Sequence, residues 1–152
     1  MNAIHFSGIF SAIAKGVKGK RGVDNLKRDQ RFNELITTTC DRLNTEPEWF
    51  DVQALSNVTH SLGKLGIKHD EFYALIVWQS GRIARDGKTQ ELNNIVWSFA
   101  TNRFKSNDLF EAVATQSGRI AKDDNLQGLS NIVWSFATNR FKSNDLFEAV
   151  AT

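Results

Sequence analysis

The chain repeats itself with a period of 37 residues, and this periodicity constrains its fold more than any other feature. The 22 residues 94–115 recur without a change as residues 131–152. The hexapeptide QSGRIA keeps the same period, because it occupies residues 79–84 and again residues 116–121. Self-similarity with a period of about 20–50 residues is typical of proteins that stack one supersecondary unit many times. The sequence therefore predicts a repeat architecture.

Two further copies are diverged. The segment LSNVTHSLGKLGIKHDEF from Leu55 aligns with LNNIVWSFATNRFKSNDL from Leu92, one period later. A partial fourth copy is indicated near Phe32, with an offset of 40 residues to the next copy. We expect a helical-repeat domain over residues 32–152 whose last repeat is incomplete, which indicates a fragment of a longer array; a short last helix that frays is the alternative.

Each period contains two helical patterns. Leu92, Ile95, Val96 and Phe99 follow the i, i+3, i+4, i+7 spacing of one helix face, and a second helix is predicted from Leu109 to Ile120. Asp51 and Ser106 are expected N-caps, and residues 102–106 are short enough to join antiparallel helices. The predicted fold is all-α, an α-solenoid of stacked antiparallel helical hairpins with a period of 37 residues. Arg82 and Arg119 are expected to end the second helices, where they suit the helix dipole.

The basic charge of the chain lies at its N-terminus. Residues 1–31 contain seven Lys or Arg and two Asp, a net charge of +5, which leaves −3 for the rest of the chain. This segment allows three interpretations. It is a weak targeting segment, a basic loop that attracts phosphate, or a partial first repeat with a helix over residues 4–15 and a loop over residues 16–30. We favour the partial repeat, because FSAIAKG at residues 10–16 mirrors HSLGKLG at residues 60–66.

The motif LSNIVWSFATNRF at residues 129–141, together with PEW at residues 47–49, resembles the octotricopeptide repeat family and its heptatricopeptide relatives. These are helical-repeat proteins, often associated with a RAP domain, to which nothing here corresponds. The resemblance implies binding of single-stranded RNA in a chloroplast or mitochondrion, with a role in transcript stability, processing or translation. Other proteins of a ribonucleoprotein complex are a further class of implied partner. The third copy departs from the motif, because His60 replaces tryptophan and Gly63 replaces alanine.

Helix geometry selects the side chains that would touch RNA. On the first helix of each repeat, an amide, an aromatic ring and a hydroxyl lie away from the residue at the centre of the buried face. The predicted RNA-binding residues are Asn57, Ser61, Lys64, Asn94, Trp97, Ser98, Thr101, Asn131, Trp134, Ser135 and Thr138. Amides pair with base edges and aromatic rings stack on bases, so the two identical repeats should prefer the same base. Phosphate contacts are expected from Arg103, Lys105, Arg140 and Lys142.

Each of these residues also has a structural interpretation. The tryptophans would wedge between hairpins, the asparagines would bind a neighbouring backbone, the serines would permit close helix packing, and the loop charges would be solvated. The rival function is a protein-interaction scaffold of the α-solenoid type. A positive strip beside Asn94 and Asn131 would favour RNA, and an acidic or apolar groove would favour a peptide.

Other classes of function have no support in the sequence. The chain contains no phosphate-binding loop, nucleophile elbow or metal-binding histidine pair, so we expect no enzyme, no cofactor and no metal. Its single cysteine, Cys40, excludes an internal disulfide. No apolar run approaches the ~20 residues of a membrane span, so no membrane partner is expected.

Overall fold

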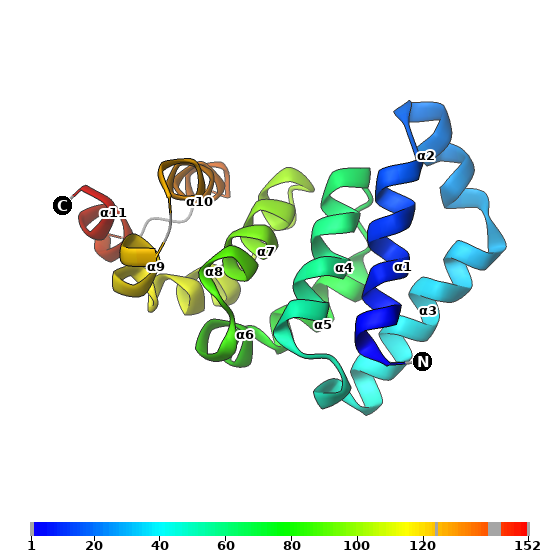
Figure 1. Cartoon of the computed structure of the whole chain (residues 1–152), viewed down its shortest axis with the longest axis horizontal. Coiled ribbons are helices and arrows are strands. Elements are labelled where there is room, and N and C mark those ends of the chain that lie inside the picture. Colours follow the sequence, from blue (N-terminus) through cyan, green and yellow to red (C-terminus); the bar gives the residue numbers. More distant parts are fainter. Residues whose placement is uncertain (1, 124, 140–143, 152) are drawn as a thin grey trace.

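The computed structural model describes residues 2–123, 125–139 and 144–151, and this part of the chain is helical throughout (Figure 1). The prediction of an all-α fold is confirmed, since no strand occurs among the described residues. The helices are α1 (Ala3–Gly16), α2 (Gly19–Arg28), α3 (Gln30–Thr45), the 3-10 helix η1 (Pro47–Trp49), α4 (Val52–Leu65), α5 (Asp70–Trp78), α6 (Ser80–Asp86), α7 (Thr89–Thr101), α8 (Asn107–Ala114), α9 (Ser117–Asp123), α10 (Leu126–Thr138) and α11 (Asn144–Ala151).

The helices begin at the expected caps. The Asp51 carboxylate accepts the backbone N–H of Ala54 at 2.7 Å and opens α4. The Ser106 hydroxyl oxygen accepts the backbone N–H of Leu109 at 3.2 Å and opens α8. Both side chains satisfy N–H groups that have no partner within their helix. The connection between α7 and α8 is the five-residue segment 102–106, as predicted.

The second helix of each repeat is not continuous, and here the prediction is wrong. A break at Gln79 separates α5 from α6, and a break at residues 115–116 separates α8 from α9. Both breaks precede the same Ser-Gly pair, and serine and glycine are poor helix formers compared with alanine or leucine. The Ser80 hydroxyl donates to the carbonyl of Val77 at 2.6 Å, which satisfies one carbonyl at the end of α5. The repeats that begin with α4 and α7 therefore consist of one long and two short helices, whereas α3, in the N-terminal copy, is continuous.

The N-terminal segment is also more ordered than predicted. The helix expected over residues 4–15 is present as α1, but the expected loop over residues 16–30 contains the helix α2. The boundary between residues 31 and 32 does not separate structural units, since α3 begins at Gln30. Phe10 of α1 lies edge-on against Phe32 of α3, with their ring centroids 6.3 Å apart. The basic segment is thus packed onto the rest of the chain.

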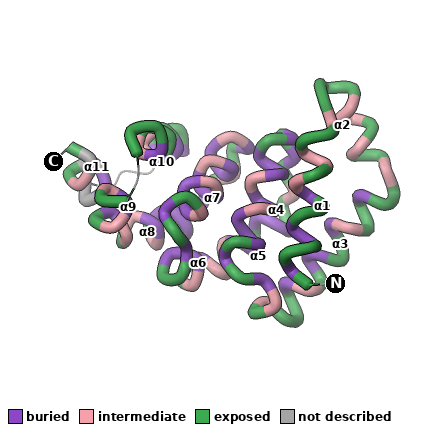
Figure 2. The backbone as a smooth tube through the Cα atoms, in the orientation of Figure 1, coloured by how far each residue is buried: buried purple, intermediate pink, exposed green. Residues whose placement is uncertain are grey.

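The first helices of successive repeats lie side by side. Helix α1 packs against α4, α4 against α7, and α7 against α10 (Figure 1). The remaining helices form a second layer, in which α3 contacts α5, α6 contacts α8, and α9 contacts α11. Buried residues concentrate where the layers meet (Figure 2). Cys40 is among them, and burial, followed by the charges of Glu71 and Asp41, raises the pKa of its thiol to about 12.

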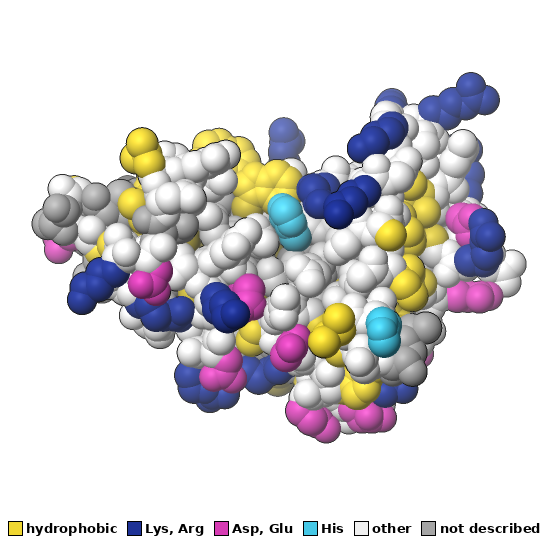
Figure 3. Space-filling view, in the orientation of Figure 1, with side chains coloured by type: hydrophobic (Ala, Val, Ile, Leu, Met, Phe, Trp, Pro, Cys, Tyr) yellow, Lys and Arg dark blue, Asp and Glu magenta, His cyan; other side chains and the backbone are white. Residues whose placement is uncertain are grey.

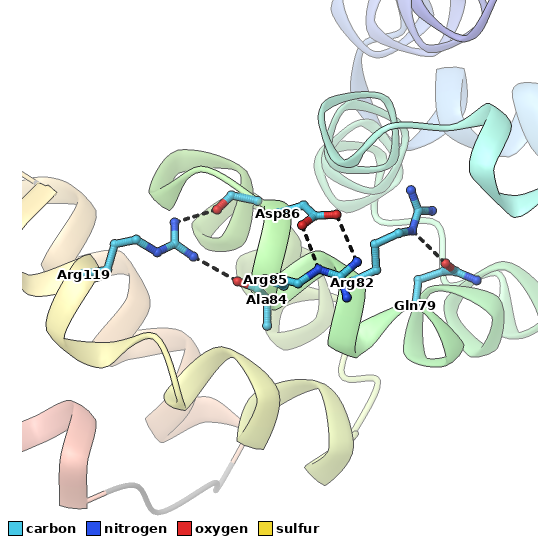
Figure 4. A network of polar contacts seen from close by, with 7 residues as sticks. Gln79, Arg82, Ala84, Arg85, Asp86 and Arg119 are labelled. Carbon is cyan, nitrogen blue, oxygen red and sulfur yellow. Dashed lines mark hydrogen bonds and ion pairs between the residues drawn. The ribbon is translucent and has the colours of Figure 1, made fainter.

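Two arginines join neighbouring repeats. The Arg119 guanidinium donates to the carbonyls of Gly87 at 2.6 Å and Ala84 at 2.9 Å, at the end of α6 (Figure 4). Arg82 lies 37 residues earlier and donates to the carbonyls of Phe50 at 2.7 Å and Pro47 at 3.1 Å. The expectation that these arginines end their own helices is wrong. They lie near the start of α6 and α9, and Arg119 caps the preceding repeat's α6.

Two asparagines make a second set of links. Asn102 donates from its Nδ2 to the Ile67 carbonyl at 2.9 Å, to the Leu62 carbonyl at 3.3 Å and to the Tyr73 hydroxyl at 2.6 Å. Asn139 lies 37 residues later and donates to the Phe104 carbonyl at 3.0 Å. Phe104 is the counterpart of Ile67. Equivalent side chains therefore bind equivalent carbonyls across both repeat boundaries.

Helices α4 and α7 approach closely at Gly63, and this yields the first testable prediction. A Cβ atom at Gly63 would lie 2.6 Å from the Oγ of Ser98 and 2.9 Å from its Cβ. Gly63→Ala should therefore destabilise the protein by about 1–3 kcal/mol, although alanine is favoured over glycine within a helix. Urea denaturation measures the change. The double variant Gly63→Ala/Ser98→Gly should recover most of the loss, and a stabilised single variant would contradict the prediction.

Candidate nucleic-acid interface

The exposed residues of the first helices form three parallel rows. On each helix the row follows the spacing i, i+4, i+7, i+11, which is a single helix face. The α4 row is Gln53, Asn57, His60 and Lys64; the α7 row is Gln90, Asn94, Trp97 and Thr101; the α10 row is Gln127, Asn131, Trp134 and Thr138. All twelve side chains are at least partly exposed. The predicted asparagines and tryptophans thus lie on one surface, together with Lys64, Thr101 and Thr138 at the ends of the rows.

The exposed strip of α7 is only one residue wide, because neighbouring helices cover the rest of this helix. In α7, all residues except the row and Glu91 are buried, since α4 and α10 pack on opposite sides of it. The sequence-based prediction placed the buried face on one side only and left Ser98 exposed. In the structure the side chains of Ser61, Ser98 and Ser135 are at most 1 % exposed. The second interpretation of these serines, close helix packing, is therefore the one that the structure supports.

The hydroxyls of these serines have partners within their own helices. Ser98 donates to the carbonyl of Asn94 at 2.8 Å, and Ser135 donates to the carbonyl of Asn131 at 2.8 Å. Ser61 makes the same bond to Asn57 at 2.7 Å. Such bonds to the residue four positions earlier satisfy a buried hydroxyl without any ligand. The serines consequently leave the set of surface contacts predicted from the sequence.

The aromatic residues differ in exposure from row to row. Trp97 is partly buried and lies edge-on against His60, with the ring centroids 5.3 Å apart. Trp134 is 47 % exposed, so about half of its surface is open to solvent. Trp97 therefore packs against the neighbouring row, as the structural interpretation predicted, and part of its surface still reaches solvent. The contact also shows that the α4 and α7 rows adjoin each other.

His60 should be uncharged at neutral pH. Burial, followed by the positive charge of Lys64, lowers the pKa of His60 below its ordinary value of 6.5. The unfolded chain then binds this proton more readily, so we expect stability to fall as the pH drops below 6.5 towards the pKa in the folded state. An NMR titration of the imidazole should give a midpoint below 6.5, and a midpoint at or above 6.5 would contradict this. A His60→Gln variant should show a flatter stability profile across the same pH range.

The amides of the rows are the clearest recurring chemistry. Within the described residues the side chains of Asn57, Asn94 and Asn131 make no hydrogen bond, so they are not held by a neighbouring backbone. The sequence-based site missed Gln53, Gln90 and Gln127, which precede these asparagines by four positions. The signal was present, since glutamine recurs there at intervals of 37 residues in all three repeats. Each row therefore begins with two amides on one helix face.

A groove lies between the α7 and α10 rows, and we call it the amide groove. It has a volume of about 420 Å³, within the range of small-ligand sites. Its lining contains six amide side chains and a single charged residue, Asp123; the lining residues are Thr89, Gln90, Asn93, Asn94, Asp123, Asn125, Gln127, Gly128 and Asn131. The two asparagines predicted to read RNA thus face one common groove, which is neither basic nor apolar.

The equivalent groove between α4 and α7 has different chemistry, and we call it the charged groove. Its volume is about 390 Å³, and its lining residues are Glu48, Asp51, Val52, Gln53, Arg82, Asp86, Lys88 and Glu91. Lys88 takes the place of Asn125, and Glu91 takes the place of Gly128. The two helices that follow these positions share the sequence NIVWSFAT, so one part of the difference between the grooves arises from the first turn of each helix. Glu48 of η1 and Arg82 and Asp86 of α6 supply further charges to the charged groove.

Two of the predicted phosphate contacts lie beyond the C-terminal end of the α7 row. Arg103 and Lys105 are exposed in the connection after α7, whereas Arg140 and Lys142 lie outside the described residues. Arg103 has a positive φ of 56°, and its counterpart Gly66 has a φ of 67°. Lys and Arg side chains also gather over α1 and α2, whereas the surface over α10 is mainly uncharged (Figure 3). The basic segment adjoins the rows because α1 packs beside α4.

Comparisons with known proteins do not assign the chain to a family: no family model matches it, and no curated protein matches it. Among the described residues, no group of three or more His, Cys, Asp or Glu is arranged to hold a metal ion. In the same part of the chain, no helix has both the length and the apolar character needed to cross a membrane.

Proposed function

We propose that this chain is a non-catalytic RNA-binding module, an α-solenoid with a 37-residue period whose rows follow a single RNA strand. The observation that carries the proposal is the recurrence of Gln, Asn and an aromatic residue on the exposed face of successive helices. Amide groups pair with base edges and aromatic rings stack on bases, which is the chemistry by which helical repeats read single-stranded RNA. The resemblance to octotricopeptide repeats supports an organellar transcript as the ligand.

The free amides support RNA more than a purely structural role. A buried amide in this chain finds partners, as Asn102 does with three acceptors. By contrast, Asn94 is half-buried and Asn131 is exposed, and neither makes a side-chain bond among the described residues. Recurring amides without an internal partner are not explained by packing. A strand that crosses the rows would give these amides a partner in each repeat.

Arg103 supports a phosphate contact. A residue with a Cβ atom costs roughly 1–2 kcal/mol in the left-handed conformation, and glycine occupies the equivalent position at residue 66. Backbone strain of this kind is retained where the side chain has a use. A positive side chain at the end of the α7 row would meet the backbone of a strand that crosses the rows.

Substitution of Arg103 separates stability from binding. Arg103→Gly should stabilise the fold by about 1 kcal/mol, because the strain is removed, while RNA binding weakens. Thermal denaturation and RNA titration at two salt concentrations measure both effects. Loss of a phosphate contact should also reduce the slope of log affinity against log salt by about 0.7. Unchanged affinity would remove Arg103 from the phosphate contacts.

The proposal is tested by crosslinking to cellular RNA under ultraviolet light. The double variant Asn94→Ala/Asn131→Ala should lose most of its crosslinked RNA while its melting temperature stays unchanged. Asn44→Ala is the matched control, because Asn44 is an exposed helical asparagine of α3 that lies outside the rows. Equal crosslinking of the double variant and the control would contradict a reading role for the rows. Capture of peptides in place of RNA would favour the interaction scaffold.

A further inference from the structure

The amide groove contains a buried acceptor without a partner. Asn93 is 8 % exposed, and its Nδ2 donates to the carbonyl of Gly128 at 3.0 Å. A carbonyl oxygen only accepts, so this bond fixes the amino group of Asn93 on Gly128. The Oδ1 of Asn93 is then left buried with no hydrogen-bond partner. A buried polar atom without a partner is costly, which indicates that another donor binds it when the groove is occupied.

The lining of the amide groove also contains a second hydrogen-bond acceptor. Asp123 lines the same groove, and its carboxylate accepts the hydroxyl of Thr89 at 3.5 Å. An ionised carboxylate accepts hydrogen bonds and cannot donate them. The glutamines and the other asparagines of the lining can rotate and present either end of their amides. The groove therefore requires a ligand that brings N–H donors to Asn93 and Asp123.

The charged groove repeats this arrangement. Glu91 lines it, and its Oε2 is a buried acceptor without a partner among the described residues. The position of Asn93 is taken there by Ser56, whose hydroxyl donates to the Glu91 carbonyl at 3.4 Å. An unpaired acceptor thus occurs in both grooves, although the residues that supply it differ. The Oδ1 of Asn139 is also buried without a partner among the described residues, although Asn139 lines neither groove.

We infer that the amide groove is a nucleobase pocket that selects a base with an exocyclic amino group over uracil, with Asn93 and Asp123 as its acceptors. This inference rests on the proposed RNA binding. An amino group brings two N–H bonds for two acceptors, as when a carboxylate accepts from the amino group of cytosine. Uracil has one N–H between two carbonyls, and these carbonyls would face the Asp123 carboxylate. The amide groove and the charged groove would then prefer different bases, although the α7 and α10 rows carry the same four residue types.

Short homopolymers of cytidine and uridine test the pocket, because the two bases have the same size and differ mainly in the amino group. Fluorescence anisotropy with the full chain should give about tenfold tighter binding of the cytidine strand. In Asn93→Ser this ratio should fall to about one. Serine occupies the equivalent positions 56 and 130, and Ser56 keeps the bond to the neighbouring helix, so the fold should tolerate this change. Ser56→Ala, which removes the equivalent bond between α4 and α7, is the control and should leave the ratio unchanged.

The outcomes are distinguishable. Equal binding of the two homopolymers by the unaltered chain, or an unchanged ratio in Asn93→Ser with an unchanged melting temperature, would overturn the pocket and leave RNA binding intact. Failure to bind either homopolymer would contradict the proposed function itself. Binding of lysine- and arginine-containing peptides without RNA would overturn both, because the acceptors would then serve a protein partner.

Discussion

Replacing Asn102 by alanine should cost about 3–4 kcal/mol of folding stability, one of the two largest effects expected in this chain. Asn102 is 8 % exposed and donates to two carbonyls and to the Tyr73 hydroxyl. Its removal leaves the Ile67 carbonyl and the Tyr73 hydroxyl without this donor, and each carries a desolvation penalty, whereas the Leu62 carbonyl still accepts the backbone N–H of Ile67. Urea denaturation followed by circular dichroism measures the loss.

The matched control is Asn94→Ala, eight positions earlier in the same repeat. Asn94 makes no side-chain bond among the described residues, so its replacement should change stability by less than about 0.5 kcal/mol. Comparing the two variants also separates an effect on folding stability from an effect on RNA binding. We expect Asn102→Ala to unfold more easily and Asn94→Ala to bind RNA less well. Equal stabilities of the two variants would show that the bonds of Asn102 contribute little.

The second large effect is expected at Arg119. Arg119→Ala removes the donor to the carbonyls of Ala84 and Gly87 and should destabilise the chain by about 3 kcal/mol. These bonds link one repeat to the one before it, and the stability of repeat arrays depends on such nearest-neighbour terms. We therefore expect a broader transition, with a lower m-value, in addition to a lower midpoint.

Arg85→Ala provides the comparison, because Arg85 is an exposed arginine that pairs with Asp86 on the surface, also drawn in Figure 4. Exposed ion pairs contribute little to stability, so this variant should unfold nearly like the unaltered chain. Arg119→Lys keeps the charge without the planar fork, and it should recover only part of the loss. Full recovery by lysine would indicate that the charge, and not the pair of directed bonds, stabilises the boundary.

The parts of the fold that could be predicted are those with a local cause. The apolar spacing from Leu92 to Phe99 predicts α7, and the oxygen atoms of Asp51 and Ser106 predict the starts of α4 and α8. Each of these follows from the hydrogen-bonding needs or the burial of one helix. The same reasoning gave the connection at residues 102–106, because its length alone makes the flanking helices neighbours.

The parts that were missed depend on contacts between repeats. Ser98 was expected at the surface because a single helix shows only one apolar face, whereas α7 is covered from both sides. The bonds of Arg119 and Asn102 end on carbonyls more than 30 positions away, and no local pattern indicates them. The glutamines at the start of the three rows are the exception. Gln53, Gln90 and Gln127 were visible at the period of 37 residues and would have been found by comparing every position of the repeats.

The links between repeats have a consequence for how such a chain can grow. The bonds made by Arg82, Arg119, Asn93 and Asn139 to a neighbouring repeat end on main-chain carbonyls. A main-chain carbonyl is present whatever side chain its residue carries, so these bonds place no requirement on the side chains of the next unit. A gene segment that encodes one unit can then be copied in tandem, and the new unit fits beside its parent without compensating substitutions.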